Sequence, residues 1–376
     1  MDRFDQHAYH SSMRHSPDKP KVSIIDVAER AGVSRATVAR ALGKYGSVST
    51  KSMQKVEAAA AELGYTANSV ARSIRTGRTM TLGVLVADMS NPFFARLLRG
   101  FSDGAESAGY DVMLVNTDES TSKELRGFQM LTEKRADGIL VAPAGLDSYE
   151  HLAKALEDGQ AIVQVDRFIP SLLADRVVVD NYEASYNAVK HVIELGHSQI
   201  ACPTLRSSTE AESATLTTTL ERHQGYLDAM ADAGKRIPEG YTPTGRGREA
   251  VRNILLKLLK SENPPTAIFA LDNSFMIGAI DAVRSLNLSI PDELSIFGFD
   301  DLEWATLIEP PLSVIDQPAY ELGVKASEVL VQRIKDREQP LHVEVLPTTW
   351  IERGSIGPPR REIHLRDFPV EPTDKV

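Results

Sequence analysis

Two arginines and a serine lie close together near the amino terminus, in the stretch AGVSRATVAR. Ser34 is a natural N-cap for a helix that starts at Arg35. A turn of about 100° per residue then brings four side chains to one outer face: Arg35, Ala36, Ala39 and Arg40. Guanidinium groups on such a face can donate to O6 and N7 of guanine, and small alanines let the helix lie deep in a groove. The stretch suggests readout of DNA bases; the alternative is a solvated face on an ordinary helical hairpin.

Hydroxyl and amide side chains around this helix are suited to a second task. Phosphate contacts fix the register of a protein on DNA but carry no sequence information. The residues that we expect to contact phosphate oxygens are Ser23, Ser34, Thr37, Ser49, Ser52 and Asn68.

A small helical domain must position these groups. Ala28, Gly32 and Val38 supply the small residue, the turn residue and the apolar residue that a helix-turn-helix needs at this spacing. Val27, Ala41 and Leu42 complete its core, and three short helical stretches between residues 23 and 63 are each followed by glycine. The sequence therefore predicts a helix-turn-helix head at residues 21–66.

The charges are divided unevenly along the 376 residues. The whole chain carries a formal net charge of -10, yet residues 1–80 hold 13 Lys and Arg against 7 Asp and Glu. The remaining residues hold 29 basic against 45 acidic side chains. A basic head on an acidic body is the distribution expected when only the head binds a polyanion.

The composition indicates a chain that folds in a reducing compartment. The single cysteine, Cys202, allows no internal disulfide and is best explained as a buried thiol. The first twenty residues lack the apolar core of a signal peptide, and no apolar run is long enough to span a membrane. We expect a cytoplasmic protein with a disordered leader at residues 1–20.

From Thr81 onward, apolar runs of strand length alternate with helical stretches. Alternation over more than two hundred residues predicts parallel sheets wound on both faces, and the length suggests two lobes with a cleft between them. The fold class is therefore a small all-α head plus an α/β body of two doubly wound parallel-sheet lobes. The expected boundaries are a hinge at 67–79, a body at 80–356 and a flexible tail at 357–376, with lobe 1 at about 80–165 and 313–345 and lobe 2 at about 166–312 and 346–356.

Many short motifs resemble one known family. "VSIIDVAERAGVSRATVARALGKYGSVSTKSMQKVEAAAAELGYTANSVARSI" is similar to the head and hinge of the lactose/galactose/purine repressor family of bacterial transcription regulators. The resemblance continues through "LGVLVADMSNPFFARLLRG", "RADGILVAP", "VVVDN", "ELGHSQIA", "GFDD" and "PPLSVIDQP". It implies a homodimer whose heads bind the half-sites of a near-palindromic operator, and a body that resembles periplasmic sugar-binding proteins.

The resemblance also assigns the hinge and shows where this sequence departs from the family. It implies that the segment NSVARSI folds on DNA, with Ala71 and Ile74 at the minor groove, where an inserted apolar side chain opens a bent groove; the alternative for Ile74 is a buried linker residue. Ala39, Met53, Ala67 and Ile74 stand where serine, arginine, proline and leucine are common. The changes at Ala39 and Met53 remove potential hydrogen bonds and affect operator affinity.

The effector site is expected at strand ends that face the cleft. We expect seven pocket residues: Asn91, Phe93, Phe94, Arg167, Tyr186, Arg222 and Asn273. The resemblance implies that Arg167, Arg222 and Asn273 occupy ligand positions, whereas Asn91 and the two phenylalanines follow the first strand, where an amide and aromatic rings could hold a sugar ring. A planar fork of donors at Arg167 suits paired hydroxyls or a carboxylate; the alternative is a salt bridge between the lobes. Core packing explains at least one of the two phenylalanines. The loop before Arg222 is longer than usual.

The stretch FALDNSFMIG reverses a pair of residues. The family carries Asn then Asp, whereas this chain has Asp272 then Asn273, so an amide falls on the ligand position. An amide both donates and accepts, which makes a phosphorylated or acidic sugar an alternative to a neutral one.

Catalytic and metal-binding patterns are weak in this sequence. Asp300 and Asp301 are neighbours on a strand end and point apart, His197 has no matching nucleophile, and the stretch GRGREA follows no strand. We therefore expect no enzyme, no cofactor and no metal. The prediction is a DNA-binding transcription repressor controlled by a carbohydrate-like effector. The alternatives are a solute-binding protein, or a regulator answering to a nucleoside or sugar acid.

Overall fold

The computed structural model describes residues 22–43, 46–65, 77–147, 149–204, 216–245 and 247–359. The chain forms two compact units, residues 1–79 and 80–376, which are treated separately below. The predicted leader and the tail beyond 359 lie outside the described residues. So do Asn68, Ala71 and Ile74 of the predicted hinge.

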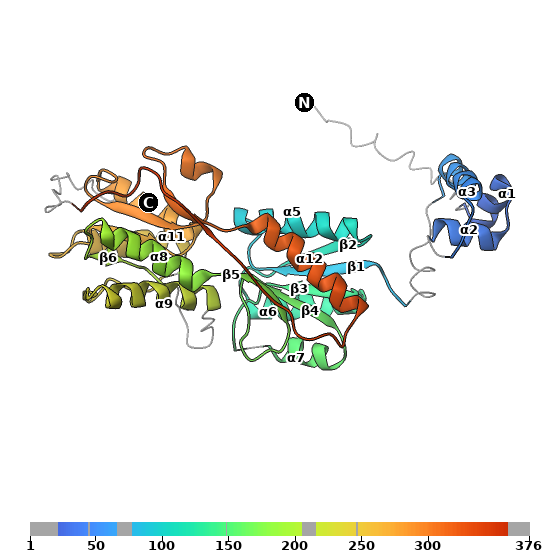
Figure 1. Ribbon diagram of the computed structural model, residues 1–376, viewed down its shortest axis with the longest axis horizontal. Coiled ribbons are helices and arrows are strands. Elements are labelled where there is room, and N and C mark those ends of the chain that lie inside the picture. Colours follow the sequence, from blue (N-terminus) through green and yellow to red (C-terminus); the bar gives the residue numbers. More distant parts are fainter. Residues whose placement is uncertain are drawn as a thin grey trace, which may run out of the picture. The chain divides into compact units, whose positions relative to one another are not determined.

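The head is a bundle of three helices, α1 (Ile24–Ala31), α2 (Arg35–Leu42) and α3 (Thr50–Leu63) (Figure 1). Each helix buries one valine completely, Val27, Val38 and Val56, and small alanines pack around them. Gly32 ends α1 with a left-handed backbone, φ 64°, which a glycine adopts without steric cost. The predicted helix-turn-helix is present, with Ala28, Ala41 and Leu42 in or against its core.

Lobe 1 of the body is a six-stranded parallel sheet with the order β10-β5-β4-β3-β1-β2. Helices α5 and α12 cover one face and α6 and α7 the other (Figure 1). Its elements are β1 (Thr81–Val86), α5 (Pro92–Ser107), β2 (Asp111–Asn116), α6 (Thr121–Glu133), β3 (Gly138–Val141), α7 (Glu150–Glu157), β4 (Ala161–Val165), β5 (Asp175–Val179), α12 (Ala319–Lys335) and β10 (Val343–Leu346). Because both faces are covered, β3 and β4 are apolar almost throughout.

Lobe 2 is a five-stranded sheet with the order β11-β9-β8-β7-β6, in which the edge strand β11 alone runs antiparallel among the described strands. Helices α8 and α9 share one apolar cluster with the sheet, and α10 and α11 share another. Its elements are α8 (Asn181–Glu194), β6 (Ile200–Ala201), α9 (Thr217–Asp232), α10 (Gly247–Leu259), β7 (Ala267–Ala270), α11 (Asn273–Ser285), β8 (Ser295–Phe299), the 3-10 helix η2 (Glu303–Thr306), β9 (Ser313–Asp316) and β11 (Thr349–Ile351).

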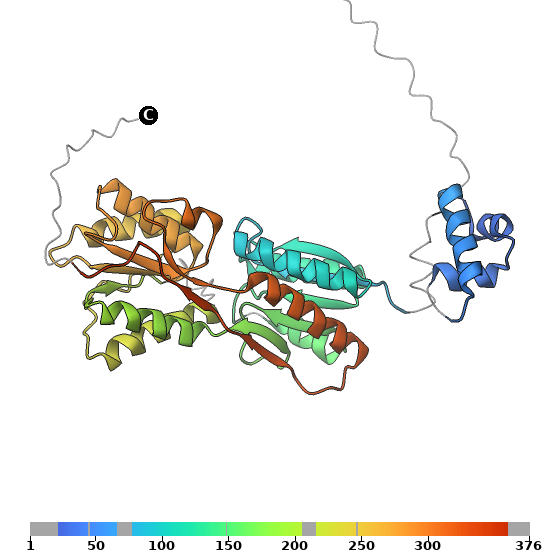
Figure 2. The same cartoon turned by 45° about the horizontal axis from the view of Figure 1, so that its top comes forward.

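The chain passes between the lobes three times, after β5, after β9 and after β10 (Figure 2). Two of these crossings differ from the predicted boundaries. Residues 175–179 pair with β4 and belong to lobe 1, and residues 313–316 pair with β8 and belong to lobe 2. An apolar run shows that a strand is buried but not which sheet it joins, so sequence patterns placed these two strands in the wrong lobe.

The body continues past the predicted start of its tail. The Gly357 carbonyl lies 2.7 Å from Nε2 of buried His197, and the Gly357 amide donates to the Ser295 hydroxyl at 3.1 Å. His197 therefore binds the segment at Gly357 to lobe 2, which is a structural role. No described helix is long and apolar enough to cross a membrane.

Candidate functional site

The outer face of α2 carries three of the four predicted base-reading residues. Arg35, Ala36 and Arg40 are exposed, while Val38 and Ala41 face the core. The Arg40 Nε donates to the Ala36 carbonyl at 3.2 Å, so this side chain lies back along its own helix. Ala39 is half-buried and differs from the predicted outward position, because it flanks the buried face of α2. Arg35 and Arg40 thus both lie on the exposed side of α2, and Arg40 would have to leave the Ala36 carbonyl to reach a groove.

The predicted phosphate-binding hydroxyls cap the three helices. Ser23, Ser34 and Ser49 are the N-caps, and each accepts from the amide three residues further on. Ser34 also bonds to the Thr37 hydroxyl at 2.9 Å, and Ser49 donates to Ser52 at 3.0 Å. Phosphate contact by these groups stays a prediction, and the Asp26 carboxylate 2.8 Å from the Ser23 hydroxyl makes Ser23 the least favourable of them.

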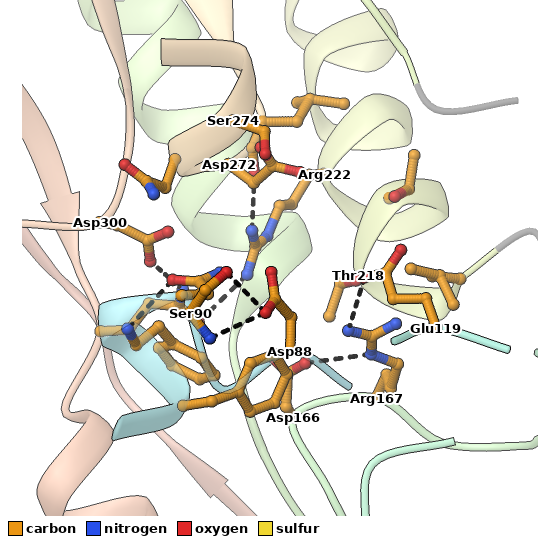
Figure 3. Close-up of a pocket in the computed structure, with 18 of the residues that line it drawn as sticks. Asp88, Ser90, Glu119, Asp166, Arg167, Thr218, Arg222, Asp272, Ser274 and Asp300 are labelled. Atoms are coloured by element: carbon orange, nitrogen blue, oxygen red, sulfur yellow. Dashed lines mark hydrogen bonds and ion pairs between the residues drawn. The ribbon is translucent and has the colours of Figure 1, made fainter. Parts of the chain in front are cut away.

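A cavity of about 510 Å³ opens in the body where strands of both lobes end (Figure 3). In open α/β sheets ligands bind at this carboxyl edge. Six of the seven predicted effector residues line it: Asn91, Phe93, Phe94, Arg167, Arg222 and Asn273. The lining includes further polar residues that the sequence-based prediction did not select: Asp88, Ser90, Asp118, Glu119, Asp166, Thr218, Thr219, Asp272, Ser274, Asp300 and Gln317.

The predicted residue Tyr186 lies elsewhere. Its hydroxyl donates to Asp232 on α9 at 2.9 Å, and its ring stacks on Tyr182 at 6.3 Å between centroids. Tyr186 follows Asn181 by five residues on α8, a rotation of about 140°. Since Asn181 accepts from Arg222 at the cavity, Tyr186 points away from it, and its assignment to the pocket was wrong.

The lobe 1 wall combines an amide, aromatic rings and a cation. Asn91 caps α5 and accepts from the Phe93 amide at 3.1 Å. Phe93 and Phe94 are both buried and pack edge to face, with 5.2 Å between centroids. Both also belong to the apolar core of the lobe, so they serve packing and cavity lining together.

Arg167 is held by two carboxylates of its own lobe. Its Nε lies 3.2 Å from Asp166 and its Nη2 3.4 Å from Glu119. Its Nη1 is buried and has no hydrogen-bond partner among the described residues. Both carboxylates belong to lobe 1, so these contacts are not the salt bridge between the lobes that was the alternative interpretation of Arg167. The guanidinium is thus fixed on two sides, while a buried donor on its third side is left unsatisfied by the described residues.

Arg222 has a different environment. Its three nitrogens donate to the Asn181 amide oxygen at 2.7 Å, the Leu271 carbonyl at 2.6 Å and Gln317 Oε1 at 3.1 Å. Its guanidinium carbon lies 3.7 Å from the Phe299 ring centroid. These contacts connect α8, α9 and the ends of β7, β8 and β9, so Arg222 organises the wall as well as lining it.

The start of α11 presents oxygen atoms to the cavity. Asp272 is the N-cap and accepts from the Phe275 amide at 2.9 Å, while Asp300 accepts from Gln317 at 2.6 Å. Burial, reinforced by the nearby Asp300 charge, raises the pKa of Asp272 to about 6. The Asn273 Oδ1 is buried without a hydrogen-bond partner among the described residues. The reversed pair thus places both an acid and an amide at the cavity.

The missed lining residues share a signal that the sequence contains. Asp88, Glu119, Asp166, Asp272 and Asp300 each follow closely after a predicted strand, at the edge where ligands bind. The sequence-based prediction excluded Asp300 as a catalytic residue and did not select it for the pocket; it bonds within the protein and also lines the cavity. In the part of the chain that the structure describes, no group of His, Cys, Asp and Glu is arranged to hold a metal ion.

Comparisons with known proteins agree with this architecture. Residues 23–68 match the family described as bacterial regulatory proteins, lacI family. Residues 79–351 match the periplasmic binding proteins and sugar binding domain of the LacI family.

Individual relatives cover nearly the whole chain. The chain is 34% identical over 343 residues to the HTH-type transcriptional regulator DegA of Bacillus subtilis (strain 168), covering 90% of this chain and 99% of the relative. It is 33% identical over 341 residues to the HTH-type transcriptional repressor PurR of Aliivibrio fischeri (strain MJ11), covering 89% and 98%. A solved LacI family transcriptional regulator from Enterococcus faecium with bound ribose is 26% identical, with a TM-score of 0.64, and covers 74% of this chain and all of that chain.

The head, the two-lobed body and the order of motifs therefore have one explanation. The chain belongs to the LacI family of bacterial regulatory proteins and is a transcriptional regulator rather than an enzyme.

Proposed function

We propose that this regulator is a repressor that binds a near-palindromic operator as a homodimer and responds to a small polyhydroxylated effector in the cavity between its lobes. The observation that carries the proposal is that Arg167, which lines this cavity, has a buried Nη1 without a hydrogen-bond partner among the described residues. A buried donor without a partner costs about 1–3 kcal/mol, and a ligand acceptor would remove this cost. The exposed arginines of α2 supply the DNA-reading function.

The charges of the cavity bear on the effector class. Two guanidinium groups face six carboxylates, so the lining is strongly acidic: Arg167 and Arg222 against Asp88, Asp118, Glu119, Asp166, Asp272 and Asp300. A phosphorylated or carboxylated sugar would add negative charge to this lining, which opposes its binding. The acidic effectors considered from the sequence are thus less favourable than a ligand rich in hydroxyl groups. The ribose-bound relative is a precedent for such a ligand in this fold.

One helix connects the cavity to a candidate dimer surface. The first residue of α11, Asn273, lines the cavity, and Ile277 and Ile280 further along line a groove on lobe 2. Trp304 and Ile308 complete the apolar part of the groove, and its rim carries two arginines and one aspartate: Arg248, Arg284 and Asp281. Apolar residues with both signs of charge suit a self-complementary interface in a two-fold dimer. A shift of α11 on ligand binding would reach such an interface directly.

Selection of bound duplexes from a random DNA library by the purified full-length chain tests the proposed function. The expected result is enrichment of one near-palindromic sequence whose affinity falls steeply as salt rises, because phosphate contacts release counterions. Recovery of unrelated sequences with equal affinity would contradict operator recognition. A selected site without two-fold symmetry would contradict the homodimer.

A further inference from the structure

The two walls of the cavity differ in hydrogen-bonding character. On lobe 1, the Arg167 Nη1 is a buried donor without a hydrogen-bond partner among the described residues. On lobe 2, the groups around the start of α11 are the carboxylates of Asp272 and Asp300 and the unpartnered Asn273 Oδ1, which are acceptors. A ligand that pairs with these groups would present an acceptor to Arg167 and donors to the start of α11.

The two arginines differ in how they contact the carboxylates. Arg167 makes ion pairs with both Glu119 and Asp166, so this group on lobe 1 keeps one carboxylate charge in excess but holds each carboxylate in direct contact with a cation. Arg222 donates to an amide oxygen, a backbone carbonyl and the side chain of Gln317, and forms no ion pair with Asp272 or Asp300 among the described contacts. The lobe 2 wall therefore keeps one carboxylate charge in excess.

Neither lobe 2 carboxylate forms an ion pair among the described contacts, although the charge of Arg222 acts on the pKa of both. Asp272 accepts from the amide of Phe275, and Asp300 accepts from the amide side chain of Gln317. Asp300 is 8% exposed, so solvent screens its charge only weakly. An ionised group in such a place is stabilised by a cationic partner far more than by a neutral donor.

We propose that the preferred effector is a polyol that carries a protonated amino group, as an amino sugar does, with the ammonium beside Asp272 and Asp300 and a hydroxyl or ring oxygen accepting from Arg167. This inference rests on the proposed effector-binding function and specifies its ligand class. An ammonium offers three donors and one positive charge to the acceptor-rich wall. A hydroxyl at the same place would satisfy a hydrogen bond but leave the excess charge.

Ligands of similar shape but different charge test whether the positive charge of an amino group strengthens binding. Isothermal titration of the purified full-length chain at neutral pH would use glucosamine, galactosamine and mannosamine, each against its neutral parent hexose and its N-acetyl derivative. At least one amino sugar is expected to bind about ten-fold more tightly than both uncharged counterparts, the order expected for one partly buried charge pair. Equal or weaker binding of every amino sugar, or no binding of any, would overturn the proposal.

Two variants test whether the charge of Asp272 causes the preference for an amino sugar over its neutral parent. Asp272→Asn keeps a residue that caps helices well but removes the charge, so the amino sugar and its parent should then bind with similar affinity. Glu262→Gln removes an exposed charge in the turn after α10, at the opposite end of β7 from the cavity, and should leave the preference unchanged. A preference that survives Asp272→Asn in full, in a variant with unaltered circular dichroism, would also overturn the proposal.

Different results would refute the amino-group requirement and the proposed regulatory function. Tight binding of a neutral hexose that alters operator affinity would refute the amino-group requirement and leave the regulator with a polyol effector intact. Failure of the ligand-free chain to bind any selected operator would refute the proposed function, whatever the cavity binds.

Discussion

Arg167 and Glu119 form an ion pair at the edge of the cavity, with 3.4 Å between Nη2 and Oε1. Glu119 has a left-handed backbone, φ 55°, and Asp118 before it has φ 49°, conformations that are uncommon for residues with a side chain. The turn after β2 thus holds Glu119 against Arg167 at some conformational cost, as binding sites often do. The pair fixes the guanidinium plane and leaves Nη1 without a hydrogen-bond partner among the described residues.

The base-reading role of α2 predicts the effect of changing Arg40. Arg40→Ala should relax the preference at one base position in each half-site by about 1–3 kcal/mol, since a bidentate contact to guanine is lost. Competition binding with single-base variants of the selected operator measures this. Arg30→Ala is a matched control that removes an arginine from α1, where Arg30 pairs with Glu62, and it should leave the base preference as it was. An unchanged preference in Arg40→Ala would remove Arg40 from base readout.

The raised pKa of Asp272 predicts a pH-dependent stability. In the unfolded chain this carboxyl ionises near its usual pKa of 3.8, whereas in the folded protein its pKa is about 6. The protonated Asp272 carboxyl therefore contributes its full stabilisation of the fold below about pH 4, and this stabilisation is lost as the pH rises through 6.

The Asp272→Asn variant has no ionisable group at this position, so its stability should not fall in this way as the pH rises. Between pH 4 and pH 7 the wild type should lose on the order of 1–2 kcal/mol relative to the variant, a value reduced for partial solvent exposure of the side chain. Urea unfolding across this range measures the difference. Parallel stability curves for the two proteins would show that the pKa of Asp272 is not raised.

The proposed dimer surface predicts a change of assembly. Ile280→Asp places a charge in the apolar groove beside Trp304 and Ile308, so it should weaken self-association by at least ten-fold, because an unpaired buried charge is costly. Sedimentation over a concentration series measures this. Leu173→Asp is a control at a 76% exposed apolar residue on lobe 1. Equal association of all three proteins would place the interface elsewhere.

The contact between α5 and α12 predicts a packing defect. A methyl group at Gly323 would lie 1.9 Å from the Leu97 carbonyl oxygen and 2.6 Å from the Phe101 amide, so the helices could not keep their spacing. Gly323→Ala should destabilise the body by about 3 kcal/mol. Lys325→Ala, on the same helix, should change stability by under about 0.5 kcal/mol. Similar denaturation midpoints for both variants would contradict this tight packing.

Local patterns predicted most of the fold but less of the cavity. Caps, glycines and apolar spacing specify the head and the strands because these are near-neighbour effects. The partner of a strand is decided by long-range packing, which explains why β5 and β9 were assigned to the wrong lobes. Tyr186 was misplaced because the rotation of α8 depends on how the helix packs against α9. The position of Glu119 just after a strand was a usable signal for the cavity edge, but its ion pair with Arg167 depends on how the turn after β2 folds and could not be predicted.

The central claim is that a ligand at Arg167 controls operator binding, and fluorescence anisotropy of the selected operator tests it. With a ligand found by thermal-shift screening, the wild type should change its operator affinity at least about ten-fold, a coupling of roughly 1.4 kcal/mol. Arg167→Ala should bind the operator as the wild type does and show no response, whereas Arg99→Ala, changed on the exposed side of α5, should respond normally. A full response in Arg167→Ala, or a ligand that binds the wild type without altering its operator affinity, would contradict the claim.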